Sequence, residues 1–185
     1  LTSLAAQGAA QTAAAPPPVG APLARIGSWL RIAPDGLVTV CTGKVEIGMG
    51  VDVALAQIVA EELDVPLERI RMVMGDTSGT PDQGGVGSSN SISSGGVALR
   101  NVAATVRGLL LQAASTRLEA PIDQLSVVNG VVSVRTSPGR SVTYGDLARA
   151  LQFEEPLRIS GSGFTLSVQG SGKPKPPASY TIVGT

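Results

Sequence analysis

The stretch Gly43-Lys44-Val45-Glu46-Ile47-Gly48-Met49-Gly50-Val51-Asp52 decides the fold, because a strand pattern ends at it and a helical pattern begins after it. Two glycines around one methionine predict a tight turn whose backbone N–H groups lie beside the positive end of the helix dipole. Such a turn suits an anion, and glycine lets a large flat ligand approach the main chain closely. A tight turn without any ligand explains the same residues equally well, so the local pattern leaves both interpretations open.

Strand and helix patterns on both sides of this stretch predict an α/β (α+β) fold. Trp29–Ile32 and Leu37–Val40 are two strand-like runs joined by a turn, and they form a hairpin that leads into the stretch. Val53–Leu63 has apolar residues at helical spacing, with Asp52 as a candidate cap, and Ile70–Met74 alternates as a strand. We expect a mixed sheet with two main helices packed on it, plus extended arms at both ends.

A second loop, residues 75–93, is rich in Gly, Ser, Thr, Asp, Asn and Gln and precedes the strongest helix prediction, residues 94–118. Ser93 or Ser94 is placed to cap that helix. Two helix N-termini preceded by small and hydroxyl residues could converge on one polyanionic ligand, such as a dinucleotide or a pterin phosphate. Two unrelated surface loops are the alternative, and the run of Gly87, Ser88, Ser89 and Ser91 favours the ligand.

The rest of the chain divides into a central domain and two arms. Residues 1–26 are mostly Ala, Gln, Thr and Pro and predict an extended arm. Asn129-Gly130 predicts a hairpin between residues 125–128 and 131–134, and a short helix is expected near residues 145–151. From residue 153 to 185 the periodicity is lost, so this segment is expected to be extended and without a core element.

Composition excludes several classes of function. The chain has 14 basic and 14 acidic residues, and no run of like charge marks a nucleic-acid surface. It has no histidine and one cysteine, Cys41, which falls in a strand pattern and is interpreted as a buried small hydrophobe. We therefore predict no histidine triad, no metal ligand and no catalytic residue in this chain.

Neither common nucleotide motif explains the glycine turn. Val53 stands where a dinucleotide fingerprint needs its last small residue, and no Gly-Lys-Ser or Gly-Lys-Thr of a P-loop occurs. The carboxylates are interpreted as solvated charges or caps rather than as acid/base groups; they are Glu46, Glu61, Glu62 and Asp82.

The order of these motifs resembles the molybdenum-binding large subunits of the xanthine dehydrogenase and aldehyde oxidase family. The resemblance rests on residues 43–50, 54–63, 71–77 and 80–84 and on the helix after Gly95-Gly96, and it covers roughly residues 29 to 185. It is strongest to the exported bacterial branch with isoquinoline oxidoreductase and nicotinate dehydrogenase type subunits. Residues 27–152 would then be part of a molybdopterin-binding domain, and residues 153–185 would lead towards the next domain of a large subunit.

The resemblance implies a site for a molybdopterin cofactor, expected as the cytosine dinucleotide form with molybdenum. The family's Glu-Met-Gly-Gln-Gly turn falls on residues 46–50, so that Gly48, Met49 and Gly50 would contact the cofactor. The family's glutamine is replaced by Met49, whose thioether cannot make an amide contact. A second family loop falls on residues 86–91, which would place Gly87 and Ser88 nearest the metal and Ser89 and Ser91 towards the phosphate.

The resemblance also implies an activity and partners. A molybdenum hydroxylase oxidises an aldehyde or N-heterocycle with water as the oxygen source, and its catalytic glutamate lies in a Gly-x-Gly-Glu segment that this chain lacks. The remaining large-subunit chain would supply that glutamate, a 2Fe-2S subunit would carry electrons, and a c-type cytochrome with haem c is a further candidate. A non-catalytic assembly subunit is the alternative.

The start of the chain bears on its location. The chain begins at Leu1 rather than Met, which suggests a processed or cleaved product, and Leu1–Ala6 is compatible with the end of a removed export signal. No apolar run reaches the length of a membrane span. With the exported branch of the family, this predicts a periplasmic protein that a partner could tether to the membrane.

Overall fold

The computed structural model describes residues 23–151, 153 and 155–183. Its first sheet contains β1 (Leu30–Ile32), β2 (Val38–Cys41) and β3 (Ile70–Val73) in that spatial order. β1 and β2 pair antiparallel, with Leu30 opposite Val40, whereas β2 and β3 pair parallel, with Val38 opposite Ile70. The sheet is therefore mixed, as predicted.

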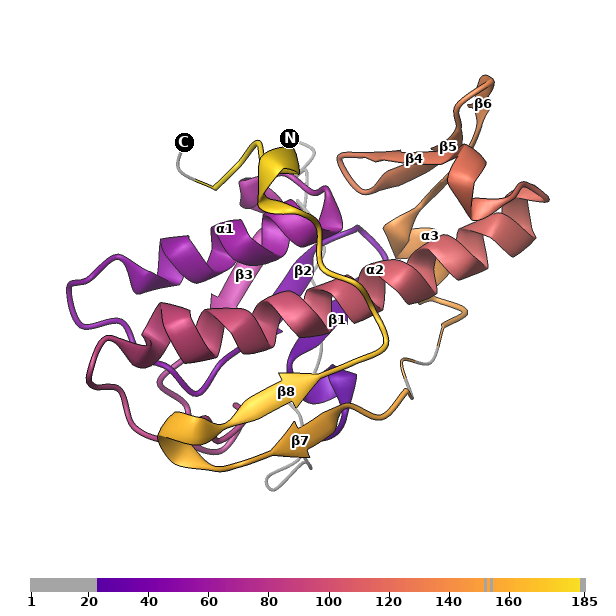
Figure 1. Ribbon diagram of the computed structural model, residues 1–185. Helices are drawn as coiled ribbons and strands as arrows, with labels where there is room; N and C mark the ends of the chain where they lie inside the picture. Colours follow the sequence, from indigo (N-terminus) through magenta and orange to yellow (C-terminus); the bar gives the residue numbers. More distant parts are fainter. Residues whose placement is uncertain (1–22, 152, 154, 184–185) are drawn as a thin grey trace, which may run out of the picture.

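Two helices run beside each other against this sheet (Figure 1). They are α1 (Val51–Leu63) and α2 (Val97–Leu118), and a six-residue π-helix, Ser91–Gly96, leads directly into α2. The helical spacing of the sequence corresponds to the packed face, because Leu55, Val59 and Leu63 of α1 have no exposed surface. Each fully buried leucine or valine of this kind stabilises the fold by about 1.5–3 kcal/mol. The α+β class with two main helices is confirmed.

A second sheet lies at the C-terminal end of α2. It consists of β4 (Leu125–Val128), β5 (Val131–Val134) and β6 (Ser137–Thr143), all antiparallel. Asn129 and Gly130 have φ of 52° and 73°, the left-handed conformation that an Asn-Gly hairpin turn requires. A short helix, α3 (Tyr144–Ala148), follows the sheet, and the Thr143 hydroxyl at its start accepts from the Asp146 N–H at 3.0 Å.

The C-terminal segment is not free of core elements, so that prediction is wrong. β7 (Arg158–Ser160) and β8 (Ser167–Gln169) form a hairpin, and β8 packs on α2. Leu157, Leu166 and Val168 are buried in the common core. At the other end, most of the predicted arm lies outside the described residues, but Ile26 is fully buried, so the core already includes the last residue assigned to the arm.

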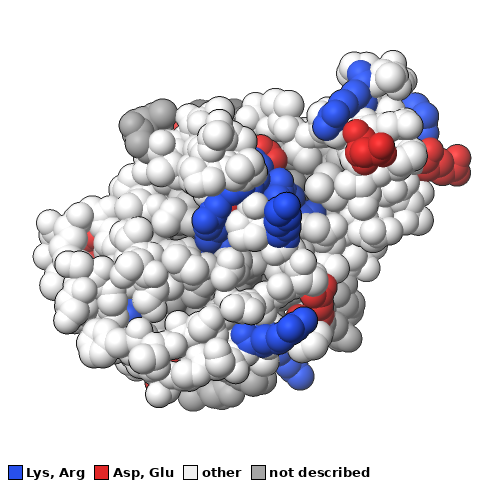
Figure 2. Space-filling view, viewed as in Figure 1, with Lys and Arg blue, Asp and Glu red and all other residues white. Residues whose placement is uncertain are grey.

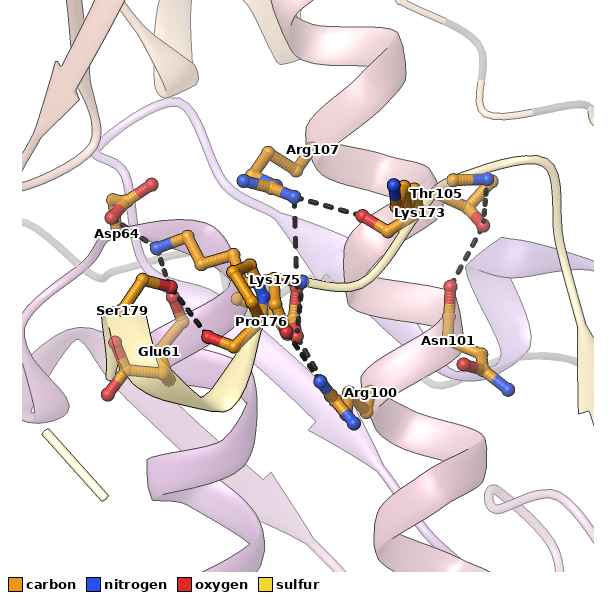
Figure 3. A network of polar contacts seen from close by, with 12 residues as sticks. Glu61, Asp64, Arg100, Asn101, Thr105, Arg107, Lys173, Lys175, Pro176 and Ser179 are labelled. Carbon is orange, nitrogen blue, oxygen red and sulfur yellow. Dashed lines mark hydrogen bonds and ion pairs between the residues drawn. The ribbon is translucent and has the colours of Figure 1, made fainter. Parts of the chain in front are cut away.

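After β8 the chain crosses α2 and α1 as a strap, residues 170–183 (Figure 1). Glu61 Oε2 accepts from the N–H groups of Thr181, Ile182 and Val183 at 2.6–3.1 Å. Lys175 joins the same network and also contacts Asp64 (Figure 3). Glu61 is only 2% exposed, so its interpretation as a solvated charge or a cap is wrong.

Glu62 holds the middle of the strap. Its carboxylate accepts from the Lys175 N–H at 3.1 Å and forms an ion pair with Arg100 at 3.0 Å. The Arg100 guanidinium also lies over the Tyr180 ring, 5.5 Å from its centre. Since Glu62 is 1% exposed, it too is a buried structural charge rather than a solvated one.

In the part of the chain that the structure describes, no helix combines the length and apolar character needed to cross a membrane.

Candidate functional site

Both loops singled out in the sequence leave the same edge of the first sheet. β2 and β3 are parallel, so the loops that follow them, residues 42–50 and 74–90, start side by side at the carboxyl ends of these strands. Thr42 continues the pairing, because its N–H donates to the Val73 carbonyl at 3.0 Å. In open α/β sheets this edge is where ligands bind. The structure therefore brings the two predicted parts of the site to one edge.

In the first turn, residues 46–50, the side chain of Glu46 folds back and binds the backbone N–H groups of the turn. Glu46 Oε1 accepts from the N–H groups of Gly48 and Met49 at 2.5 Å, and Oε2 accepts from Val51 at 2.5 Å. Desolvation alone would raise the pKa of Glu46, but these backbone donors lower it to about 2. Glu46 thus caps the start of α1, one of the roles expected for it. Asp52 lies inside the helix and is not the cap, so that prediction is wrong.

The glycines of this turn are required by conformation. Gly48 and Gly50 have φ of 97° and 66°, and a Cβ at either position would meet no atom within 4 Å. The Met49 side chain is 53% exposed at the tip of the turn. Cofactor contact by these three residues remains a prediction. The N–H groups of Gly48 and Met49 could take part in it only if the Glu46 carboxylate moved away.

Residues 86–91, where the second loop leads into the helical run, differ from the first turn because two of their backbone donors are open in the described structure. Ser88 and Ser89 adopt left-handed φ of 49° and 56°, which is uncommon for residues other than glycine. Within the described chain, the N–H groups of Ser88 and Ser89 have no hydrogen-bond partner. These open donors stand before the helical run that continues into α2, where the helix dipole favours an anion.

Ser91 is the first residue of the π-helix and is 8% exposed. Ser93 and Ser94 lie inside that π-helix, so the prediction that one of them caps α2 is wrong. Asn90 precedes the π-helix and closes the loop instead, since its Oδ1 accepts from Gly87 N–H at 3.4 Å and its Nδ2 donates to the Gly85 carbonyl at 3.1 Å. The loop is therefore held from inside while Ser88 and Ser89 are both exposed.

A buried polar cluster lies beneath the second loop. Lys44 and Gln83 are 0% and 2% exposed, and the Lys44 Nζ donates to the carbonyls of Gln83 at 3.1 Å and Gly85 at 3.2 Å. Gln83 Oε1 accepts from Thr42 Oγ1 at 2.5 Å and from the Gly43 N–H at 2.9 Å. This cluster, Thr42, Lys44 and Gln83, ties the second loop to the residues just before the first turn.

A turn from the C-terminal hairpin covers the second loop, and no local sequence pattern indicates this contact. The 3-10 turn Gly163–Thr165 approaches so closely that a Cβ on Gly84 would lie 2.4 Å from the Gly163 Cα. Phe164 is 59% exposed, and its ring would lie 3.8 Å from a Cβ on Gly87. A Cβ on Gly85 would meet no atom within 4 Å, so there is open space beside the loop.

A pocket of about 400 Å³ opens between Gly43 and Val45 on one side and residues 75–84 on the other. Asp76 and Asp82 are part of its wall, and hydrogen bonds from the hydroxyl and N–H of Ser78 lower the pKa of Asp76. These carboxylates make the pocket unsuitable for a phosphate. An anion at this edge is therefore expected at residues 86–91 and not in the pocket.

Other candidate residues behave as structural groups. Asp82 stays exposed and accepts from the Gly84 N–H at 2.9 Å, in line with a solvated charge. Cys41 is fully buried, and burial raises the pKa of its thiol, which confirms it as a small core residue. Among the described residues, no three His, Cys, Asp or Glu side chains are grouped so that they could hold a metal ion.

Comparison with known proteins shows the family of the chain. A family model described as "Molybdopterin cofactor-binding domain" matches residues 6–185. The chain is 33% identical over 156 residues to a nicotinate dehydrogenase subunit of Pseudomonas putida, and 37% identical over 134 residues to the beta subunit of isoquinoline 1-oxidoreductase of Brevundimonas diminuta. These matches cover 84% and 69% of this chain but only 12% and 17% of the relatives.

The same similarity is found among solved structures. CO dehydrogenase from Oligotropha carboxidovorans superposes with a TM-score of 0.58 at 29% identity, over 65% of this chain and 15% of that one. The chain thus spans a small part of the length of the proteins that it matches.

Proposed function

Because this chain belongs to the family of molybdopterin cofactor-binding domains, we propose that it forms part of the cofactor cradle of a molybdenum hydroxylase. The reaction proposed for the complete protein is oxidation of an aldehyde or N-heterocycle with water as the oxygen source. The bound cofactor supplies the redox-active molybdenum centre. The residues of this chain bind and orient the cofactor, and they hold the loop at residues 86–91 in place.

The observation that carries the proposal is the pair of unpartnered donors at Ser88 and Ser89, at the start of the helical run into α2 in the described structure. Both residues are exposed, so their N–H groups are accessible to a ligand, and two adjacent open donors ahead of a helical run favour an anionic group there. Gly87 leaves room for close approach, and the hydroxyls of Ser88, Ser89 and Ser91 suit oxyanions. We assign this loop to the phosphate-bearing part of molybdopterin cytosine dinucleotide.

The rest of the machinery is proposed to lie outside this chain. A catalytic glutamate from the remaining large-subunit sequence would act as base, and 2Fe-2S clusters, with a c-type cytochrome in some assemblies, would carry the electrons away. The named relatives support this, because the proteins from Pseudomonas putida and Brevundimonas diminuta are each one subunit of an enzyme. Another relative is the gamma subunit of a dehydrogenase complex from Paenarthrobacter nicotinovorans. A periplasmic location is proposed with the same assembly.

The test uses Gly87→Val in the complete multi-subunit protein, with Gly139→Val on β6 as the matched control. A Cβ at Gly87 meets nothing closer than 3.8 Å, and one at Gly139 meets nothing within 4 Å, so both variants should fold. We expect Gly87→Val to lose molybdenum and cytosine nucleotide, measured by metal analysis and by chromatography of the released nucleotide. Full cofactor content in Gly87→Val would refute the assignment of the loop.

A second candidate function, a non-catalytic assembly subunit, is favoured by the first turn. Met49 cannot make the amide contact of the family's glutamine, and Glu46 already occupies the backbone donors. An assembly subunit predicts that Gly87→Val leaves the cofactor content unchanged, whereas a cofactor cradle predicts loss of cofactor from an intact complex.

A further inference from the structure

Lys44 is a buried cation whose role the fold alone does not explain. Its side chain has no exposed surface, and its stem packs so tightly that a Cβ on Gly95 would lie 3.0 Å from Lys44 Cγ. Lysine is almost never fully buried unless its charge is paired. Here its two partners are the carbonyl oxygens of Gln83 and Gly85, one at each end of the Gln83-Gly84-Gly85 segment that enters the second loop.

The charge of Lys44 is not neutralised by a carboxylate within ion-pair distance in the described residues. Asp82 is the acidic residue that acts on it electrostatically, and burial still lowers the pKa of the Lys44 ammonium. Carbonyl dipoles hold an ammonium, but they do not cancel its charge. The ammonium of Lys44 is therefore held by carbonyl dipoles and not by a carboxylate ion pair.

Some hydrogen-bond donors beside Lys44 have no acceptor within the described residues. The Gln83 Nε2 is buried and has no partner in the described structure, although the Oε1 of the same amide accepts two hydrogen bonds. An ammonium carries three donors, and the contacts of Lys44 account for two of them. Together with the open N–H groups of Ser88 and Ser89, these donors could serve an anion.

From this geometry we propose that Lys44 is the positioning residue of the second loop: it fixes residues 83–91 through two carbonyls and supplies the positive charge behind a bound oxyanion. The inference rests on the proposed function in one respect, that the oxyanion is a phosphate group of the cofactor. Lys44 binds the carbonyls of the loop and does not touch the oxyanion, whereas Ser88 and Ser89 donate to the oxyanion directly.

The test compares Lys44→Met with Lys173→Met in the complete multi-subunit protein. Methionine keeps an apolar stem of similar length and removes the ammonium, and Lys173 is an exposed lysine whose replacement removes the same charge. We expect the cofactor to dissociate from Lys44→Met at least about tenfold faster than from the natural protein, followed by nucleotide release, because hydrogen bonds to a charged group are lost. Lys173→Met should release it at the natural rate.

Hydrogen exchange of the loop gives a readout that is independent of the cofactor. In cofactor-free protein, Lys44→Met should speed the amide exchange of residues 83–87 and leave α2 unchanged, since only the loop loses its anchor. Unchanged cofactor release together with unchanged exchange would overturn the proposal. If Lys44→Met does not assemble, Lys44→Gln, which keeps a neutral donor, replaces it, and failure of both to assemble would show a role in folding alone and overturn the proposal.

The two hypotheses fail in different ways. If Gly87→Val loses the cofactor and Lys44→Met keeps it, the cradle stands and the role of Lys44 is wrong. If Gly87→Val keeps the cofactor, the phosphate does not lie on this loop, and the exchange measurement alone then decides whether Lys44 anchors it.

Discussion

The turn at residues 46–50 and the loop at residues 86–91 leave the same sheet edge and lead into neighbouring helices, yet they differ in what faces their backbone donors. In the first, Glu46 accepts from Gly48, Met49 and Val51, so the helix start is satisfied by the chain itself. In the second, the donors of Ser88 and Ser89 are open within the described structure. Backbone donors before a helix are thus closed by a side chain in one place and open in the other.

The side-chain charges that serve the two regions are also opposite in sign. A carboxylate fills the donors of the first turn, whereas the Lys44 ammonium binds the carbonyls below the second loop. In Figure 2 few charged side chains lie at the end of the molecule where α1 and α2 begin, and the basic groups gather beside the strap. The two loops therefore differ in the sign of the side-chain charge that binds their backbone groups.

The largest effect on stability is expected at Glu61, a second carboxylate that accepts hydrogen bonds from consecutive backbone N–H groups. Glu61→Ala should lower the free energy of unfolding by about 2–4 kcal/mol, because three N–H groups of the strap lose their acceptor. Denaturant unfolding of the purified protein measures this. An effect below about 0.5 kcal/mol would show that water replaces the carboxylate, and would weaken the view that such closed turns are structural.

Glu46→Ala tests the closed turn directly. The amides of Gly48, Met49 and Val51 should exchange with solvent roughly tenfold faster, as expected when a helix cap is removed. The exchange of Ser88 and Ser89 should not change, and these two amides serve as the internal control. Equal acceleration in both regions would mean that the two loops are not separate units.

The pH dependence of Glu46 distinguishes its charge from its hydrogen bonds. Its folded pKa, about 2, is below the ordinary value of 4.5, so its stabilisation is present above the unfolded pKa and is lost as pH falls through the folded pKa. The difference in melting temperature between the natural protein and Glu46→Gln should be constant from about pH 7 to about pH 5 and shrink between about pH 4.5 and pH 2. A difference that is independent of pH would contradict a carboxylate cap.

Met49→Gln should have the smallest effect on stability, within about 0.5 kcal/mol, because the side chain is half exposed at the tip of the turn. It restores the amide that the family places here. If the turn contacts the cofactor through this side chain, cofactor release from the complete protein should become slower. An unchanged release rate would limit cofactor contact to the second loop.

Much of the fold can be predicted from sequence because its elements carry strong local patterns. The helical stripe of Leu55, Val59 and Leu63 and the Asn129-Gly130 turn are local signals, and the structure confirms both. The hairpin of β7 and β8 carries no such signal, because its strands have three residues each, too few for a period to show.

The two candidate loops are predictable from sequence, but the electrostatics around them are not. The family resemblance and the loop compositions indicate both loops. Charged residues such as Lys44 and Glu61 are normally expected at the surface, and only the fold shows that distant carbonyl and N–H groups bury them. The Glu46 cap depends on the φ angles of Gly48 and Gly50, which bring backbone N–H groups around one carboxylate.

Hydrogen exchange of the complete protein with and without its cofactor tests the central claim most directly. We predict that the cofactor slows exchange at Ser88 and Ser89, whose N–H groups would donate to it, and leaves Gly48 and Met49 unchanged, because Glu46 already binds them. Protection of Gly48 and Met49 with no change at Ser88 and Ser89 would contradict this claim.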